Sequence, residues 1–329
     1  MLILPAADVR RALPMAETIA AMKSAYAALS SGKVEVPLRS RLPIPPHEAV
    51  SLFMPVFLQD ESGEALAVKI VSLFPHNPGR GLPLIHAAVL VLEADTGRPL
   101  ALLEGSILTA IRTGAASGAA TDLLARPDSR VVAIFGAGVQ GRTQLEAVCT
   151  VRKIETAWIF DSQAERSEGF IHEMAGQGPL HADLRAAHSP EQAVADADII
   201  CTATTSLIPV FADLHLKPGV HINGVGSYTP EMQEVPSETV RRALLVVDSR
   251  PAALSEAGDL IQPIRQGLIS ETHIHAELGE IVLGERPGRE SETQVTFFKS
   301  VGVAVQDAAA ARLALSNAQE MGLGQVVNW

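Results

Sequence analysis

The chain is poor in cysteine and in aromatic residues, and each shortage excludes a kind of site. Its two cysteines, Cys149 and Cys201, are too few for a disulfide framework and lack the C-x-x-C spacing of a zinc site. We therefore expect a protein of the reducing cytoplasm that holds no metal. Aromatic residues make up only 4 % of the sequence, so polar side chains and backbone groups should bind any ligand.

Basic residues and long apolar runs are scarce as well. Lysine and arginine number 26 against 37 acidic residues, a net charge of −11, and no stretch gathers enough basic side chains to neutralise a run of phosphates. No apolar run approaches the ~18 residues that span a bilayer, and the first residues, MLILPAADVRRAL, do not follow the pattern of a signal peptide. We expect neither nucleic acid nor a membrane as a partner.

The residues that are present indicate a globular protein of roughly two domains, since a domain holds about 150 residues. Residues 14–32 carry apolar side chains at three- and four-residue spacing, which predicts a helix. Between 34 and 104, strand-like runs alternate with turn clusters such as PHNPGRG, a pattern typical of an antiparallel sheet. The segment SILTAIRTGAASGAATDLLA, rich in small residues and ending before Pro127, predicts one long helix that links two domains.

After Ser129, short apolar strands alternate with helical segments; the strand runs are RVVAIF, TAWIF, ADIICTAT, GVHINGV and ALLVVD. This alternation predicts a parallel sheet covered by helices on both faces, a Rossmann-type doubly wound domain over residues 118–299. The tail, a strand-like QVTFFKS followed by an amphipathic helix, is expected to return to the first domain. The fold class is thus α/β, with an additional α+β domain of residues 1–117 and 300–329.

A glycine-rich turn, GAGVQG at 136–141, follows the first of these strands and precedes a helical segment. In a G-x-G-x-x-G turn, Gly136 permits the tight turn, Gly138 lets the backbone approach a diphosphate, and Gly141 lets the helix pack closely on the strand. The next strand ends in Asp161, whose carboxylate can accept from the ribose hydroxyls and would repel a 2′-phosphate. The pattern predicts dinucleotide binding, with NAD favoured over NADP.

Two neighbouring features leave alternatives open. Arg166 is close enough in sequence to contact a 2′-phosphate, which keeps NADP possible, although such a residue is usually just solvated. Thr204, Thr205 and Ser206 follow the strand ADIICTAT at a carboxyl end, where open α/β sheets bind ligands. A simple helix cap is the other interpretation of these residues.

The first domain offers three cationic side chains for a substrate: Arg39, Lys69 and Arg112. Lys69 lies inside the apolar run ALAVKIVSL, where an unpaired ammonium is costly, so we expect an anion or acceptor to face it. Each of the three, taken alone, is also compatible with an ordinary surface or ion-paired residue.

An ordered series of blocks along nearly the whole chain resembles the ornithine cyclodeaminase and mu-crystallin family. The blocks are PLR at 37–39, Met54-Pro55, VKIV around Lys69, ADTGRPLALLEGSILTAIRTGAAS, FGAGVQG, GVGSYTPEMQEV, EAGDL and FFKSVGVAVQD. The resemblance implies a homodimer in which the first domain binds substrate and forms the subunit interface. It also implies a Rossmann domain that binds NAD(H) or NADP(H).

At matched positions, the resemblance implies that Arg39, Lys69 and Arg112 surround a small imino or amino acid, with Arg112 holding its α-carboxylate. A guanidinium can grip a carboxylate with two hydrogen bonds, and a lysine can act as a point charge or proton donor. His86 matches a histidine of ketimine-reducing relatives and could relay a proton, or it is an ordinary sheet histidine. Val301 would close the substrate side. The residues assigned to the cofactor are Thr113, Gly136, Gly138, Val139, Gln140, Gly141, Asp161, Thr204, Gly226 and Ser300.

One departure from the family pattern bears on the reaction. Where ornithine cyclodeaminases have a catalytic aspartate, in a G-G-D-x-P block, this chain has Tyr228. Cyclodeamination needs a base for amines, and a phenol of ordinary pKa about 10 is a poor one near neutrality. Reduction of a preformed imine does not require a base that deprotonates amines. The leading hypothesis is therefore an NAD(P)H-dependent reductase of cyclic α-imino acids such as Δ1-pyrroline-2-carboxylate, giving L-proline.

Three other functions stay open. Tyr228 or a water could serve as the base of a true ornithine cyclodeaminase. The enzyme could instead be an alanine-type amino acid dehydrogenase. A crystallin-like binding protein without turnover is the non-enzymatic alternative, but a pure binder would not need three desolvated cations.

Overall fold

The computed structural model describes residues 1–328. They form two compact units, the first made of Met1–Arg112 with the segment from Ala304 onward and the second of Thr113–Val303. These limits lie a few residues from the expected limits at 117 and 300. Helix α3 (Gly105–Leu124) runs across the first limit. Because that helix is continuous, no change in the sequence pattern marks where one unit ends.

The first unit is built on a sheet. Its strands are β1 (Leu2–Leu4), β2 (Val34–Glu35), β3 (Ser40–Ile44), β4 (Ala49–Asp60), β5 (Gly63–Leu73), β6 (Ile85–Leu92), β7 (Pro99–Glu104) and β16 (Gln325–Val326). Their order is β16-β1-β7-β6-β5-β4-β2, with β3 on β4. The strands between 34 and 104 pair antiparallel, which confirms the sequence prediction.

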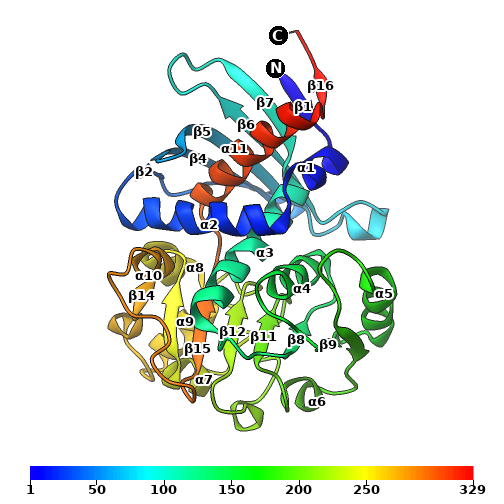
Figure 1. The fold of residues 1–329 in the computed structure, drawn as a ribbon, viewed down its shortest axis with the longest axis vertical. Helices are drawn as coiled ribbons and strands as arrows, with labels where there is room; N and C mark the ends of the chain where they lie inside the picture. Colours follow the sequence, from blue (N-terminus) through cyan, green and yellow to red (C-terminus); the bar gives the residue numbers. More distant parts are fainter. Residues whose placement is uncertain (329) are drawn as a thin grey trace. The chain divides into compact units, whose positions relative to one another are not determined.

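Helices α1 (Ala6–Ala12), α2 (Met15–Ser30) and α11 (Ala304–Met321) belong to the same unit. The predicted first helix is confirmed, because α2 begins directly after Pro14 and Gly32 follows it at φ +72°. Helix α11 packs against α2, β4 and β5 (Figure 1). Its buried face is mostly alanine, and such small side chains allow a helix to approach its neighbours closely. Short 3-10 turns lie at Pro45–His47 and Pro78–Arg80.

The second unit contains a parallel sheet. Its strands are β8 (Val131–Phe135), β9 (Thr156–Phe160), β10 (Asp183–Ala186), β11 (Ile199–Thr202), β12 (His221–Gly224), β13 (Leu244–Val247), β14 (Ala276–Glu277) and β15 (Thr296–Lys299). Their order is β10-β9-β8-β11-β12-β15-β13-β14 (Figure 1). The order reverses between β8 and β11, as in a doubly wound Rossmann-type sheet.

The strand that the sequence pattern groups with the tail lies in the second unit, within the limit of residue 299 expected for the Rossmann-type domain. Strand β15 pairs with β12 and β13 inside the parallel sheet of the second unit, and only the helix after it joins the first unit. Every side chain of β15 is buried, including Phe297 and Phe298. A strand that is apolar on both faces suits the middle of a covered parallel sheet better than a half-exposed antiparallel one.

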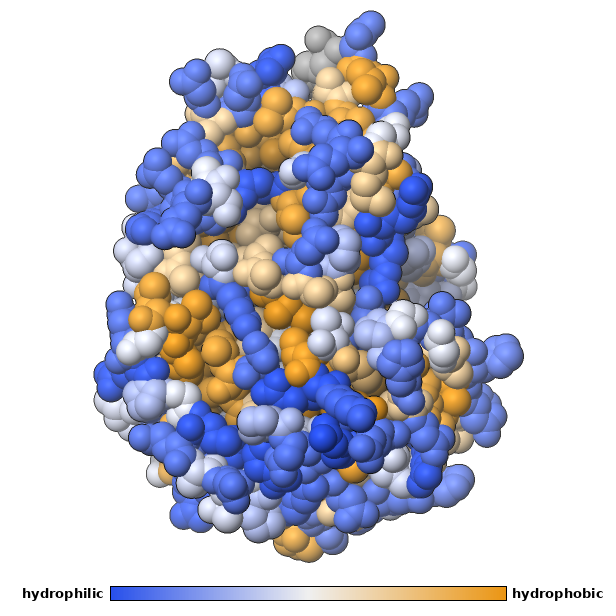
Figure 2. All heavy atoms as spheres, in the orientation of Figure 1, coloured by the Kyte–Doolittle hydropathy of each residue, from blue (hydrophilic) through white to orange (hydrophobic). Residues whose placement is uncertain are grey.

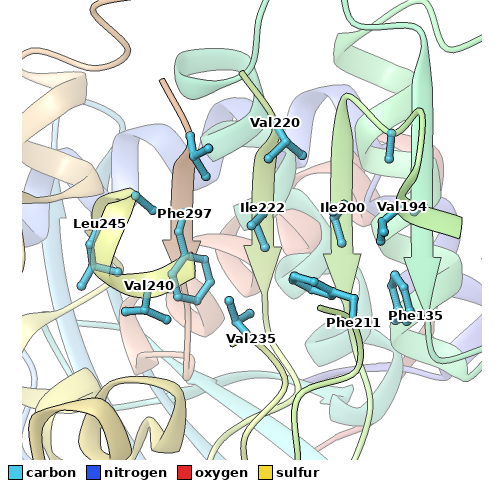
Figure 3. Close-up of a cluster of buried hydrophobic side chains, with 14 of the residues drawn as sticks. Phe135, Val194, Ile200, Phe211, Val220, Ile222, Val235, Val240, Leu245 and Phe297 are labelled. Atoms are coloured by element: carbon cyan, nitrogen blue, oxygen red, sulfur yellow. The ribbon is translucent and has the colours of Figure 1, made fainter. Parts of the chain in front are cut away.

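Two cores cover the two faces of this sheet. Phe135, Ile200, Ile222 and Phe297, from four neighbouring strands, lie in one core (Figure 3). Adjacent residues such as Ile134 and Ile199 point to the other core, as expected where side chains alternate between faces. The helices of this unit are α4 (Val139–Val151), α5 (Ala164–Met174), α6 (Pro190–Val194), α7 (Ser237–Arg242), α8 (Arg250–Glu256), α9 (Gly258–Arg265) and α10 (Leu278–Val282). Short 3-10 turns lie at Asp213–His215 and Glu271–His273. Across residues 1–328, none of the helices combines the length and apolar character needed to cross a membrane.

Candidate active site

The glycine-rich turn lies where predicted, between β8 and α4. A Cβ at Gly136 would lie 2.5 Å from the carbonyl oxygen of Ala203, and one at Gly141 would lie 2.1 Å from that of Gly136. Neither position can accept a side chain. A Cβ at Gly138 would have no atom within 4 Å, so the backbone there is open to a ligand. The first positions of α4, where N–H groups lack helical partners, are Val139 and Gln140.

Asp161 ties the end of β9 to this turn. Its Oδ2 accepts a hydrogen bond from the N–H of Ala137 at 2.9 Å, and its Oδ1 accepts from the N–H of Gln163 at 3.1 Å. Arg166 lies beside it, with Nη1 4.0 Å from Oδ2, and is 61 % exposed. The carboxylate thus stands next to the glycine-rich turn, where the fingerprint places the ribose contact.

Thr113 lies against the helix that follows the turn. Its carbonyl oxygen accepts from Nε2 of Gln144, a residue of α4. A Cβ at the next residue, Gly114, would lie 2.4 Å from the carbonyl oxygen of Thr143. The two helices therefore approach each other without room for a side chain at this point.

The loops after β11 and β12 are joined by a carboxylate that the sequence analysis did not assign. Glu234 is fully buried and accepts hydrogen bonds from Thr204 and from the N–H of Gly226. The interpretation of Thr204 as a helix cap is wrong, because the segment after it is not helical. Its Oγ1 instead donates to Glu234 and accepts from the N–H of Ser206.

A second unassigned carboxylate holds the segment after β15. Oδ2 of Asp248 accepts from Oγ of Ser300 at 2.8 Å and from the N–H groups of Val301 and Gly302 at 2.9 and 2.7 Å. The predicted residues Ser300 and Val301 are thus fixed by the end of β13, which directly precedes Asp248.

Tyr228 lies in the loop after β12 and is 38 % exposed. Partial burial raises the pKa of its phenol above the ordinary value of 10. The side chain therefore stays protonated near neutrality and can donate a hydrogen bond. The unprotonated form that could act as a base is therefore scarcer near neutrality than in a phenol of ordinary pKa.

Two of the three candidate cations of the first unit, Lys69 and Arg112, meet around Asp307 of α11. Nζ of Lys69 lies 2.6 Å from Oδ2 of Asp307, and Nε of Arg112 lies 3.1 Å from Oδ1. Nη1 of Arg112 also donates to Oε1 of Gln306 at 2.7 Å, and Nε2 of Gln306 donates to the hydroxyl of Tyr26 at 2.7 Å. Asp307 is the anion that the position of Lys69 requires.

Burial is the main cause that lowers the pKa of Lys69, to about 8, and the positive charges of Arg112 and Arg39 lower it further. The carboxylate of Asp307 opposes this shift. Lys69 is 2 % exposed and Arg112 is 5 % exposed. With Lys69 protonated, two buried cations face one carboxylate, so the cluster of Lys69, Arg112 and Asp307 carries one excess positive charge.

The structure does not bring His86 into this cluster. On the paired strands β5 and β6, Lys69 is opposite Val89, whereas His86 is opposite Ser72. Side chains alternate between faces along a strand, so Lys69 and His86 point to opposite faces of the sheet. His86 instead lines an open cavity of about 360 Å³ together with His47, Ser72, Phe74, His76, Asn77 and Arg80.

Comparisons with known proteins identify relatives along nearly the whole chain. The model of the ornithine cyclodeaminase/mu-crystallin family matches residues 1–322. The chain is 41 % identical to a Delta(1)-pyrroline-2-carboxylate reductase of Bacillus cereus, with 100 % of both chains covered. The solved Delta(1)-pyrroline-2-carboxylate reductase of Thermococcus litoralis, in complex with NADH and L-proline, superimposes with a TM-score of 0.94 at 46 % identity, covering 99 % of this chain and 100 % of that one. An archaeal alanine dehydrogenase dimer with bound NAD gives a TM-score of 0.91 at 31 % identity, covering 100 % and 99 %.

Proposed function

Because the chain belongs to the ornithine cyclodeaminase/mu-crystallin family, we propose that it is an NADH-dependent reductase of cyclic α-imino acids. The leading reaction converts Δ1-pyrroline-2-carboxylate to L-proline. The observation that carries the proposal is the buried cluster of Lys69, Arg112 and Asp307, whose single excess positive charge suits a substrate with one carboxylate. The relatives named above support the choice of an imine as the reacting group.

The second unit fits a dinucleotide. The backbone is open at Gly138, while the contacts at Gly136 and Gly141 exclude side chains and keep the turn tight. Asp161, at the end of β9, favours a ribose with a free 2′-hydroxyl over a 2′-phosphate. NADH supplies the hydride when bound.

The first unit fits the imino acid. The planar guanidinium of Arg112 is suited to hold the substrate carboxylate, and Asp307 and Gln306 fix its orientation. Imine reduction adds a hydride to the carbon and a proton to the nitrogen of the C=N bond. Lys69, with a pKa of about 8, is mostly protonated at pH 7 and yet able to release a proton, so we assign it as the proton donor.

The alternatives are weaker. A cyclodeaminase would need Tyr228 or a water as its base, and the raised pKa of the Tyr228 phenol makes the first of these less available. An amino acid dehydrogenase is the second candidate, because the alanine dehydrogenase shares the fold over the whole chain. The binding-protein hypothesis leaves the cost of burying Lys69 and Arg112 unexplained.

We further propose a homodimer formed through the sheet of the first unit, in the cytoplasm. Exposed apolar side chains on or beside strands of this sheet include Leu38, Leu42, Ile70 and Ile85. Figure 2 shows that apolar residues also gather in patches between hydrophilic ones on the face it presents. The dimeric alanine dehydrogenase supports this assembly, and free thiols at Cys149 and Cys201 suit a reducing compartment.

The test follows NADH and NADPH oxidation with Δ1-pyrroline-2-carboxylate and its six-membered homologue, beside an ornithine assay for NAD-dependent ammonia release. Fast imine reduction with no ammonia from ornithine is the expected result. Ammonia release at a comparable rate would replace the reductase with a cyclodeaminase. Faster reductive amination of pyruvate than imine reduction would favour the dehydrogenase.

A further inference from the structure

The loop after β12 depends on one buried carboxylate that the proposed reaction does not use. Oε1 of Glu234 accepts from the N–H and from Oγ1 of Thr204, at 2.6 and 2.7 Å. Oε2 accepts from Oγ1 of Thr202 at 3.0 Å and from the N–H groups of Gly226 and Ser227 at 2.7 and 3.1 Å. Five donors, one from the last residue of β11 and four from the loops after β11 and β12, therefore converge on one side chain.

The atoms around the carboxylate of Glu234 are closely packed. A Cβ at Gly226 would lie 2.4 Å from Oε1 of Glu234 and 2.3 Å from the carbonyl oxygen of Thr204. Thr204 and Ala203 also form the wall beside the glycine-rich turn, since a Cβ at Gly136 would lie 3.2 Å from Cγ2 of Thr204. A shift of Glu234 would thus move the surface against which the turn rests.

Asp259 hydrogen-bonds the backbone at Glu234, and Lys299 forms an ion pair with Asp259. Oδ1 of Asp259 accepts from the N–H groups of Glu234 and Val235 at 2.7 and 3.0 Å. Nζ of Lys299, the last residue of β15, lies 3.1 Å from Oδ2 of Asp259. Glu234, Asp259 and Lys299 are all fully buried. Burying two carboxylates and one ammonium costs free energy of desolvation. This cost argues that the cluster serves a purpose other than stability.

The hydrogen bonds favour the ionised form of Glu234. Three of the five donors are backbone N–H groups, which cannot accept, so a protonated carboxyl would have to turn a threonine hydroxyl into an acceptor. Burial and the nearby charge of Asp259 raise the pKa of Glu234, while Lys299 and Thr204 lower it. The ionised form is therefore lost at a higher pH than in an exposed glutamate.

We propose that Glu234 is a positioning residue for cofactor binding. It locks the loops after β11 and β12 together beside the glycine-rich turn. Strand β11 is one of the two strands at the point where the sheet order reverses, and open α/β sheets bind nucleotides beyond the carboxyl ends of such strands. The inference rests on the proposed function only in taking NADH as the ligand.

The test is a titration of NADH fluorescence without substrate, on wild type, Glu234→Gln and the control Glu231→Gln. Glu231 lies in the same loop with an exposed side chain. The amide of Glu234→Gln keeps the size but turns one acceptor into a donor that faces donors, so the Kd for NADH should rise by about tenfold. The control should bind as wild type does. An unchanged Kd in a folded Glu234→Gln protein would overturn the proposal.

Two further readouts separate positioning from a merely structural role. The Kd of wild type should rise as the pH falls and Glu234 gains a proton, with Asp259 and Lys299 as the charged groups that face it, whereas Glu234→Gln should not show this rise. In steady state, KM for NADH should increase more than kcat decreases. If Glu234→Gln does not fold, Thr202→Val removes a single donor and should shift the Kd in the same direction by a smaller factor. A wild type that does not bind NADH would refute the proposed function instead.

Discussion

Replacing Lys69 with methionine should stabilise the protein while it abolishes catalysis. The pKa of Lys69 is lowered from 10.5 to about 8, mainly by burial. At 1.36 kcal/mol per pKa unit, the protonated side chain costs the folded state about 3 kcal/mol at pH 7. Methionine has a similar shape without that charge, and Arg112 still pairs with Asp307. The free energy of unfolding of Lys69→Met at pH 7 should therefore exceed that of wild type by about 1–3 kcal/mol.

The pH dependence of this difference gives a sharper test. Between pH 8 and 10.5 the unfolded wild-type chain holds the Lys69 proton and the folded one has released it, so wild-type stability rises with pH. The gain of Lys69→Met over wild type should shrink across that interval. Urea unfolding at pH 7, 8.5 and 10 measures it, with the exposed Lys33→Met as a control that should change stability by less than about 0.5 kcal/mol.

Two outcomes would contradict the reasoning. A loss of stability in Lys69→Met at pH 7 would mean that Lys69 gains more from Asp307 than burial costs it. A difference independent of pH would mean that Lys69 titrates at the same pH in both states. The kcat for imine reduction should fall by at least about 100-fold, the usual contribution of a positioned proton donor.

Three other perturbations have definite expected outcomes. Asp307→Asn removes the charge that, among those named above, raises the pKa of Lys69. The alkaline limb of the pH profile of kcat/KM should therefore move to lower pH. An alkaline limb that stays in place would exclude Lys69 as the titrating group. Buried His221, with a pKa lowered to about 3 from 6.5 chiefly by burial, should make stability fall by about 5 kcal/mol as the pH drops from 6.5 to 3, because only the unfolded chain takes up the proton. His221→Gln should lack this component of the acid dependence in urea unfolding. Gly138→Ala should weaken NADH binding in a fluorescence titration with little loss of thermal stability, whereas Gly141→Ala should lower the melting temperature markedly.

The sequence predicts most of the second unit because its strands are short apolar runs between helices. Such runs predict β8, β9 and β11, and the position of the glycine-rich turn between a strand and a helix predicts its role. The exceptions are the two edge strands, β10 with the half-polar residues DLRA and β14 with only the two residues AE. An edge strand buries less of its surface, so its sequence lacks the apolar run that marks a covered parallel strand.

The site was predicted less completely, for a physical reason. The apolar surroundings of Lys69 indicate that some anion must face it, but only the packing of α11 on β5 identifies Asp307. Glu234 and Asp248 leave even less trace, because most of their partners are backbone N–H groups, which every residue other than proline has. Sequence motifs identify side chains that contact a ligand more easily than those that hold a loop in place.

The carboxyl edge of the parallel sheet shows how these holding groups serve function. Asp161, Glu234 and Asp248 each accept backbone N–H groups from a loop that follows a strand, and together they fix the ends of β8, β11, β12 and β15. A loop fixed in advance loses less conformational freedom when it binds, so less of the binding free energy is lost to ordering it. Because Asp161 stands at the expected ribose contact and Glu234 and Asp248 lie behind the loops, neutralising any one of the three should weaken cofactor binding more than it slows the chemical step. Neutralising Lys69 should slow the chemical step more than it weakens cofactor binding. The ratio of the change in Kd for NADH to the change in kcat therefore distinguishes groups that position the loops from groups that take part in the reaction.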